Sequence, residues 1–126
     1  MTGRIVHFEI PFDDGDRARA FYSGVFGWQM QEMPEMQYTM AMTGPVGENS
    51  MPSEPGYING GMFQRTDQLS VPVLTINVDS IDDALDKVEA SGGKTVAGRS
   101  AVGDMGFTAY INDCEGNLIG LWENAG

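Results

Sequence analysis

Only one cysteine and one histidine occur among the 126 residues. A lone Cys114 can form neither a disulfide framework nor a cysteine metal cluster within the chain. His7 lies far from Cys114 in the sequence and nothing near Cys114 would activate its thiol, so we interpret Cys114 as a turn residue. Any prediction of chemistry therefore depends mainly on His7.

Basic residues are also scarce. Seven Lys and Arg residues stand against 18 Asp and Glu, which gives a formal net charge of −11. A surface with this charge repels phosphate backbones and anionic lipid head groups. We therefore expect neither nucleic acid nor a membrane as a partner. The same charge would favour a cationic ligand, although net charge more often serves solubility.

Long apolar runs are absent as well. No stretch of the sequence approaches the ~20 residues of a membrane helix. The N-terminus leads directly into a strand pattern, without the apolar core of a signal peptide. We therefore expect a cytoplasmic protein. The length suits one domain that buries its own hydrophobic core.

A strand is predicted near the N-terminus. Val6, Phe8 and Ile10 are apolar and alternate with other residue types. This period of two is typical of a strand with one face on a core. It places His7 and Glu9 together on the opposite face.

A helix is predicted directly after this strand. The segment Asp13–Asp16 supplies turn chemistry and a helix N-cap. Four apolar residues then recur with the spacing of a helical stripe: Ala18, Phe21, Tyr22 and Val25. Gly27 would end the helix as a left-handed C-cap.

The second half of the chain begins the same pattern again. Aligning Asp13 with Asp79 also pairs Gly27 with Gly93, with no gap across the strand, turn and helix. This repeat of strand, helix and three strands predicts an α+β domain of two βαβββ modules, with helices on one face of a curved sheet. We expect a single domain over residues 1–126, with module one at about 1–66 and module two at about 67–126. The sheet face away from the helices is the expected ligand cavity.

The later strands of module two are predicted from local patterns. Thr95–Ala97 is expected to be a short strand and Gly98–Gly106 a loop. Phe107–Ile111 and Asn117–Glu123 are expected to form a hairpin around the turn sequence Asp113–Gly116.

Both ends of the chain resemble one known superfamily. His7–Asp14, Arg17–Tyr22 and Val25–Trp28 resemble the opening of vicinal oxygen chelate proteins, which include glyoxalase I, extradiol dioxygenases, and bleomycin- and fosfomycin-resistance proteins. Asp113–Glu123 resembles the final hairpin of that superfamily, with Cys114 at the usual proline. The resemblance implies paired modules whose mostly antiparallel sheet encloses a U-shaped cavity, usually in a homodimer.

The resemblance also implies where a metal would be held. In the metal enzymes of the superfamily, ligands come from the first, fourth, fifth and eighth strands. These positions correspond to His7, to a residue within Asn59–Gly61, to Val73 and to Gly120. A catalytic divalent metal needs about three protein ligands and an open position. Since only His7 can ligate, we expect no cofactor, and a metal held by His7 with Glu9 is the minority alternative.

The expected site consists of one set of residues on the cavity face. The ligand-binding candidates are His7, Glu9, Gly60, Gly61, Met62, Tyr110, Gly120 and Trp122. His7 is either a general base or hydrogen-bond donor, or a relic paired with Glu9 or a backbone carbonyl. Glu9 either orients His7 or receives a cationic group, or it is a solvated or dimer-facing carboxylate.

The remaining candidates shape the predicted site. Trp122 shares a strand face with Gly120, so it is either an aromatic wall beside a gap or ordinary packing. Tyr110 is a second wall candidate. Gly60 and Gly61 leave room for a ligand or for a bulge. Met62 belongs to a set of methionines that either adapt to an irregular ligand or fill the core.

Two functions of different classes follow from this sequence. The first is a small-molecule-binding protein without a catalytic metal that takes a hydrophobic or cationic ligand in the sheet cavity. The alternative is a lyase, isomerase or dioxygenase of the glyoxalase type that uses His7 in catalysis. A pure protein–protein module is conceivable, but nothing in the sequence favours it, and the fold alone does not decide the function.

Overall fold

The computed structural model describes residues 3–48 and 51–126. Contacts divide the chain into two compact units. The N-terminal unit is His7–Pro72, and the C-terminal unit is Val73–Gly126 together with the first residues of the chain, up to Val6. The division thus falls somewhat later than the predicted module boundary, and the first strand contributes to both units.

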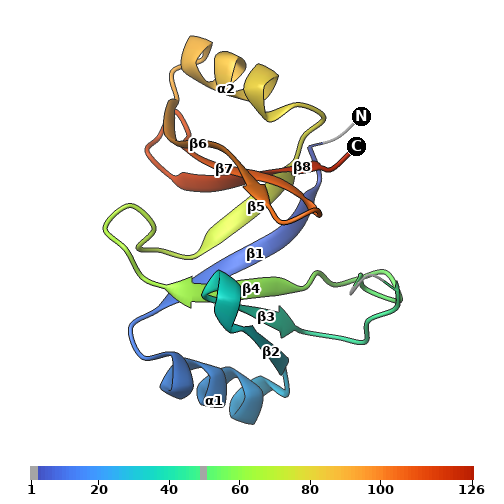
Figure 1. Cartoon of the computed structure of the whole chain (residues 1–126). Helices are drawn as coiled ribbons and strands as arrows, with labels where there is room; N and C mark the ends of the chain where they lie inside the picture. The colour runs from blue at the N-terminus through green and yellow to red at the C-terminus, as the bar shows by residue number, and fades with distance from the viewer. Residues whose placement is uncertain (1–2, 49–50) are drawn as a thin grey trace. The chain divides into compact units, whose positions relative to one another are not determined.

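The N-terminal unit contains one helix and four strands (Figure 1). Its elements are β1 Ile5–Phe12, α1 Gly15–Phe26, β2 Gln29–Met33, the short 3-10 helix η1 Pro34–Met36, β3 Tyr38–Met42 and β4 Gly60–Gln64. The strands lie in the order β2-β3-β4-β1. Only the pair β1–β4 is parallel, with Phe8 opposite Gly60 and Glu9 opposite Gly61.

The C-terminal unit repeats this order of elements (Figure 1). Its elements are β5 Val73–Asn77, α2 Ile81–Ala90, β6 Lys94–Val102, β7 Gly106–Asn112 and β8 Leu118–Asn124. The strands lie in the order β5-β8-β7-β6, with β5–β8 parallel and the other pairs antiparallel. The predicted α+β fold of two βαβββ modules is confirmed. No helix in the described ranges is long and apolar enough to cross a membrane.

The helix N-caps confirm the internal repeat at the level of single residues. Asp14 accepts a hydrogen bond from the backbone N–H of Arg17 through Oδ1, at 3.1 Å. Ser80 occupies the same position in the repeat and accepts from Asp83 N through Oγ, at 3.2 Å. Gly27 then ends α1 with a φ of 76°, a left-handed backbone that glycine adopts without strain.

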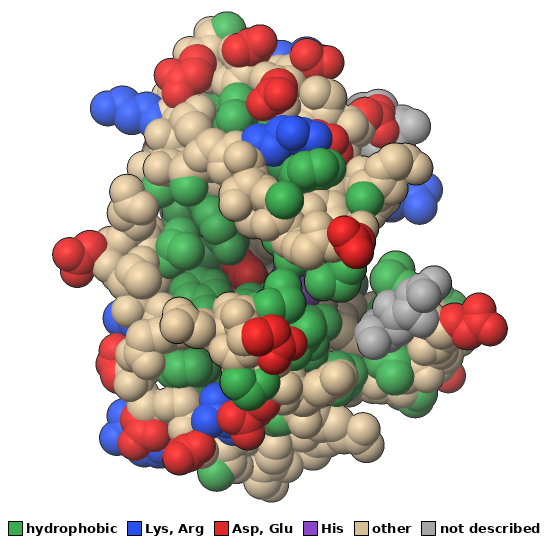
Figure 2. All heavy atoms as spheres, viewed as in Figure 1, with side chains coloured by type: hydrophobic (Ala, Val, Ile, Leu, Met, Phe, Trp, Pro, Cys, Tyr) green, Lys and Arg blue, Asp and Glu red, His purple; other side chains and the backbone are tan. Residues whose placement is uncertain are grey.

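The C-terminal unit has a compact apolar core beneath α2. Ile81 from the helix, Ala109 and Ile111 from β7 and Leu121 from β8 are all buried together. Glu123 of β8 strengthens this junction, because its Oε1 accepts the N–H of Ile81 at 2.8 Å. The outer side of α2 carries acidic residues, which Figure 2 shows gathered over that helix.

The packing of α1 differs from the prediction. No residue of α1 is buried, and Phe21 and Val25 of the predicted stripe are 53% and 59% exposed. Tyr22 makes the expected kind of contact, since its ring stacks on Trp28 at a centroid distance of 4.8 Å. Trp28 in turn lies 5.4 Å from the ring of Phe8 in β1. The stripe spacing identified the helix correctly but overestimated how much of the helix the unit covers.

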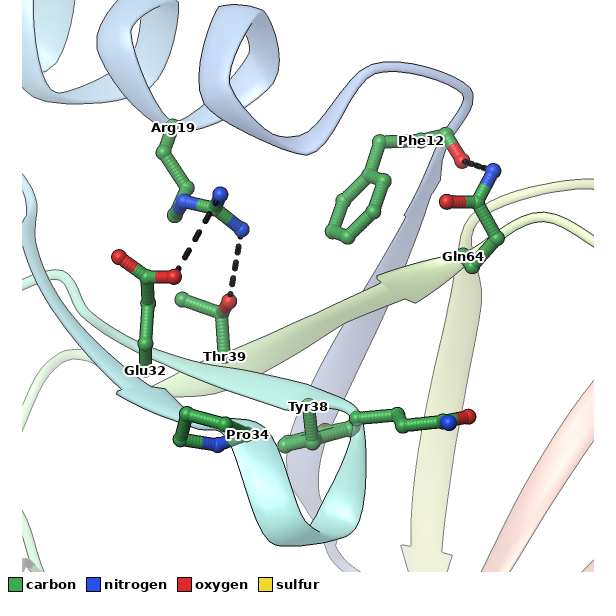
Figure 3. A pocket seen from close by; sticks show the side chains of 8 residues that line it. Phe12, Arg19, Glu32, Pro34, Tyr38, Thr39 and Gln64 are labelled. Carbon is green, nitrogen blue, oxygen red and sulfur yellow. Dashed lines mark hydrogen bonds and ion pairs between the residues drawn. The ribbon is translucent and has the colours of Figure 1, made fainter.

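A polar contact holds α1 to the sheet instead (Figure 3). The guanidinium of Arg19 donates to Thr39 Oγ1 of β3 at 3.2 Å and pairs with Glu32 of β2 at 3.5 Å. A Cβ on Gly15 would lie 2.8 Å from the Arg19 side chain, so glycine at this position leaves the space that the guanidinium occupies. Arg19 thus fastens the helix across two strands.

Strand β6 is longer than predicted. It runs over Lys94–Val102, which includes part of the segment predicted as a loop. Its pairing with β7 shifts register between Thr95 and Ala97 and again between Ala97 and Ser100. These irregularities interrupt the period-two pattern. The local sequence therefore looked like a short strand and a loop.

Replacing Arg19 with Ala is expected to lower the free energy of unfolding by about 1–3 kcal/mol, because Thr39 Oγ1 is buried and loses its charged donor. Arg17→Ala on the same helix is the control and should change it by less than about 0.5 kcal/mol. Urea unfolding measures both values, and amide hydrogen exchange in α1 reports the detachment. Equal effects of the two substitutions would contradict an anchoring role for Arg19.

Candidate functional site

His7 and Glu9 point to the same face of β1, as predicted, and both reach Tyr38 of β3. His7 Nε2 lies 2.8 Å from the Tyr38 hydroxyl. The same hydroxyl donates to Glu9 Oε2 at 2.8 Å. Glu9 is only 7% exposed. The three side chains form one continuous hydrogen-bonded chain inside the N-terminal unit.

The direction of this chain determines the tautomer of His7. A tyrosine hydroxyl has one proton to donate, and Tyr38 donates it to Glu9. Tyr38 must therefore accept from His7, so Nε2 carries the proton and Nδ1 carries the lone pair. No hydrogen bond to Nδ1 is found among the described residues. The atom of His7 that can receive a proton from a ligand is therefore Nδ1.

Gly61 makes the position of Tyr38 possible. A Cβ at residue 61 would lie 1.7 Å from the Tyr38 hydroxyl and 2.0 Å from its Cζ. Real side chains do not approach this closely, so any residue other than glycine would displace the phenol. We predicted that Gly61 leaves room for a ligand or for a bulge. The space above it is in fact filled by Tyr38.

Gly60 and Met62 lie on the opposite face of β4 from Gly61, because side chains alternate along a strand. A Cβ at Gly60 would meet the carbonyl oxygen of Phe8 at 2.5 Å, and Met62 is fully buried, with 0% of its surface exposed. The prediction that these two residues share a site with His7 is therefore corrected. Met62 fills the core, and Gly60 accommodates Phe8.

Asn59, just before β4, is a polar residue of the site that sequence reasoning did not single out. It is 6% exposed, and its Oδ1 accepts the backbone N–H of Thr43 at 2.8 Å. Its Nδ2 is buried and has no hydrogen-bond partner among the described residues. An unpaired buried donor is rare in native proteins, so this amide group is a notable feature of the unit.

The C-terminal unit brings together the other predicted residues. Gly120 of β8 pairs with Thr75 of β5 and with Tyr110 of β7. A Cβ at Gly120 would lie 2.9 Å from Thr75 Oγ1, so the protein itself fills much of the predicted gap. By strand alternation Tyr110 and Trp122 share this face.

The indole of Trp122 packs over a different glycine from the one predicted. A Cβ at Gly106 would lie 2.6 Å from Cζ2 of Trp122, and the indole N–H donates to Asn124 Oδ1 at 2.8 Å. Glu123, between these two residues, turns to the other face and caps α2. That orientation agrees with the alternation expected from the sequence.

The residues at the four superfamily ligand positions offer few donors to a metal. Nε2 of His7 is committed to Tyr38, and the phenol of Tyr38 occupies the space where a side chain at residue 61 would lie. Val73 and Gly120 carry no ligating atoms. In the described part of the chain, no group of three or more His, Cys, Asp or Glu side chains is placed to hold a metal ion. These donors do not fit a metal that needs about three protein ligands.

A hollow lies between α1 and the sheet (Figure 3). It has a volume of about 360 Å³. Its lining residues are Phe12, Arg19, Glu32, Pro34, Gln37, Tyr38, Thr39 and Gln64. The Arg19 guanidinium is paired with Thr39 and Glu32, and Gln64 Nε2 donates to the carbonyl of Phe12. Because its main polar groups already bond to one another, we assign it to the anchoring of α1.

Burial lowers the pKa of His7 to about 4, from the ordinary value of 6.5. Taking the ring out of water disfavours its charged form. His7 is therefore neutral at pH 7. It can accept a proton or a hydrogen bond there, and it does not repel a cation.

Lowering the pH from 7 to 5 is expected to reduce the free energy of unfolding by about 2 kcal/mol through His7. The unfolded chain takes up a proton at His7 near pH 6.5, whereas the folded chain resists protonation until about pH 4. The contribution is thus fully present above pH 6.5 and is lost as the pH falls toward 4. Urea unfolding of the wild type and of His7→Gln at both pH values measures it. An identical pH dependence of the two proteins would refute it.

Comparisons with known proteins agree with this architecture. Residues 4–44 match the family model described as bleomycin resistance protein-like N-terminal. CFP32 of Mycobacterium bovis, named as a candidate glyoxylase, is 30% identical over 117 residues, which cover 87% of this chain and 41% of the relative. The chain therefore spans about two fifths of the length of that relative. A Vibrio parahaemolyticus protein named as a probable lactoylglutathione lyase is 29% identical, covering 98% of this chain and 92% of the relative.

Solved structures show the same fold at low identity. A hypothetical protein from Bacillus halodurans superposes with a TM-score of 0.62 at 15% identity, covering 98% of this chain and 96% of that one. A variant of Streptomyces coelicolor methylmalonyl-CoA epimerase, in complex with 2-nitronate-propionyl-CoA, superposes with a TM-score of 0.64 at 19% identity and covers 100% of both chains. Taken together, the two βαβββ units and these superpositions show that the chain has the fold of these solved structures, and the sequence matches show that it is similar to glyoxalase- and bleomycin-resistance-like proteins of the vicinal oxygen chelate superfamily.

Proposed function

We propose that the protein binds a small hydrophobic or cationic molecule without a catalytic metal, and that the His7–Tyr38–Glu9 chain is the polar part of the binding site. The main support for this proposal is the hydrogen bond from His7 Nε2 to the Tyr38 hydroxyl, at 2.8 Å. It engages Nε2 in a chain of protein groups and leaves Nδ1 without a protein hydrogen-bond partner among the described residues, which supports a role for Nδ1 in ligand binding.

The surroundings of this chain support an apolar or positively charged ligand. Met40 and Met42 alternate with Thr39 and Ala41 along β3, so they share the face of Tyr38. Their flexible thioethers adapt to irregular apolar shapes. Glu9 supplies carboxyl oxygens that can accept from or attract a cationic group, and the lowered pKa of His7 keeps the imidazole from opposing a cation at pH 7.

The names of the relatives support only the general class of function. One is named as a glyoxylase and another as a lactoylglutathione lyase, and the Mycobacterium bovis relative is much longer than this chain. Both names concern small organic molecules. The donor set around His7 differs from the ligand set that a metal-dependent member needs. We therefore place the binding of a small molecule first and metal-dependent turnover behind it.

We also propose a homodimer, as the family resemblance implies. The exposed apolar side of α1 supports this, because Phe21, Val25 and Phe26 are all more than half exposed. Phe21 and Phe26 also lie edge to face at a centroid distance of 6.3 Å, so they form a continuous apolar surface. Such surfaces usually mark an interface.

A matched pair of probes tests the binding proposal. Benzyltrimethylammonium should bind about tenfold more tightly than neopentylbenzene, its neutral counterpart of the same shape, in the presence of EDTA, because Glu9 attracts the cation. Glu9→Gln should abolish that preference. Glu32→Gln, on the α1 face of the sheet, should leave it unchanged. Isothermal titration and thermal shift measure the affinities.

Two results would contradict the binding proposal. The first is that neither probe binds the wild-type protein. Binding that disappears with EDTA and returns with one equivalent of a divalent metal would show that a metal forms the site after all.

A second function is favoured by the direction of the hydrogen-bonded chain. His7 Nδ1 can take a proton from a carbon acid, while Tyr38 and Glu9 stabilise the imidazolium that forms, as the carboxylate does in a catalytic triad. The C–H bond breaks, an N–H bond forms, and the electron pair remains on the substrate as an enolate. Return of the proton to the same or a neighbouring carbon completes an isomerisation without a co-reactant.

Proton exchange in D₂O tests this second function. The methyl protons of acetophenone, observed by NMR, should exchange faster with the wild-type protein than without it, with an acid limb near pH 4, the lowered pKa of His7. His7→Ala should remove the acceleration, and Tyr38→Phe should reduce it by about 10- to 100-fold. Glu32→Gln is the control. Exchange rates that do not depend on His7 would exclude this chemistry and leave the binding proposal intact.

A further inference from the structure

Asn59 presents a buried donor that the protein itself does not satisfy. The residue is 6% exposed, and its Nδ2 has no hydrogen-bond partner among the described residues. Burying a donor without a partner costs free energy. A group of this kind in a native fold calls for an acceptor from outside the described chain.

The orientation of the amide is determined by its neighbour. Oδ1 of Asn59 accepts the backbone N–H of Thr43 at 2.8 Å. Exchanging the oxygen and nitrogen of the amide would set two donors against each other. The unpaired atom is therefore the NH₂ group, which can donate but cannot accept.

Asn59 is a neighbour of His7 along the strand pair β1–β4. Phe8 lies opposite Gly60 in the parallel pair β1–β4, so His7 and Asn59 are the neighbouring residues at the start of the same pair. Adjacent strands lie about 5 Å apart. By alternation, Asn59 also shares the face of Gly61, over which Tyr38 packs. An acceptor that reaches Asn59 would therefore be next to His7.

We propose that Asn59 binds the oxygen of a neutral carbonyl group, such as a ketone, aldehyde or amide, in a ligand held at the His7 site. A carboxylate is a poorer match, because Glu9 lies on the same face and the whole chain carries a formal net charge of −11. A hydrocarbon or a simple ammonium group would leave the donor unpaired. This inference rests on the proposed binding function and adds the chemical class of the ligand to it.

The donor also has a consequence for the chemistry of such a ligand. A hydrogen bond to a carbonyl oxygen strengthens as negative charge develops on that oxygen. With His7 Nδ1 beside it, the site would hold the oxygen of an enolate at Asn59 while His7 carries the proton. Asn59 is thus a binding residue for the ground state and a stabilising residue for any enolate that forms.

Paired probes and an isosteric variant test the assignment. Acetophenone should bind the wild-type protein about tenfold more tightly than ethylbenzene, which lacks the carbonyl oxygen, and more tightly than benzoate. Asn59→Asp keeps an oxygen for the N–H of Thr43 but removes the donor, so it should reduce the tenfold preference to about one. Glu32→Gln, on the α1 face of the sheet, is the control and should leave the preference unchanged.

A direct measurement on the wild type remains decisive if Asn59→Asp does not fold. The side-chain ¹H–¹⁵N signals of Asn59 should shift downfield with acetophenone and not with ethylbenzene. Equal affinity for the two probes, or a preference that survives Asn59→Asp, would overturn the role of Asn59 while leaving the binding function standing. An Asn59 amide that keeps contact with a bound water at saturating acetophenone would also overturn it. Failure of acetophenone and ethylbenzene to bind would overturn this inference, and failure of benzyltrimethylammonium and neopentylbenzene as well would overturn the proposed function with it.

Discussion

The N-terminal unit is organised around one phenol. Tyr38 bridges an imidazole and a carboxylate that belong to the same strand, with 2.8 Å to each. Without the bridge, Glu9 would be a buried carboxylate without this donor, and that arrangement costs far more than an exposed charge. The bridge in turn needs Gly61, because the phenol lies where a side chain at residue 61 would be. The Tyr38 phenol therefore links β3 to β1 and packs on β4 at Gly61. A change in the register of β3 on β4 would break these contacts.

Much of the fold could be predicted because its signals are local. The alternation in β1, the caps of both helices and the turn at Asp113–Gly116 each occupy a few consecutive residues. Asp14 and Ser80 cap their helices at equivalent points of the repeat, which agrees with the alignment of Asp13 with Asp79. The full length of strand β6 escaped prediction, because its register shifts break the periodic pattern. The exposure of α1 also escaped prediction, because a stripe shows which side of a helix is apolar and not what covers it.

The site was predictable only in part, for a physical reason. Alternation along β1 correctly placed His7 with Glu9, but the partner that joins them comes from β3, and only the pairing of strands decides which residue that is. The glycines show the same limit. Glycine in a strand indicates close approach of another group, yet it does not say whether that group is a ligand or a side chain of the protein. At Gly60, Gly61 and Gly120 the approaching atoms belong to Phe8, Tyr38 and Thr75.

The lowered pKa of His7 favours a role as a hydrogen-bond acceptor, whereas its hydrogen-bonded chain to Glu9 favours a role as a base. A pKa of about 4 makes the free imidazole a weak base, which suits a residue that accepts a hydrogen bond from a ligand. The link through Tyr38 to Glu9 acts in the opposite direction, because it stabilises positive charge on the ring once a proton arrives. A bound ligand that excludes water would increase both effects, since electrostatic interactions strengthen as the local dielectric falls. On the proposed function, the resting site therefore favours binding, and proton transfer requires a ligand whose oxygen is held while its carbon loses the proton.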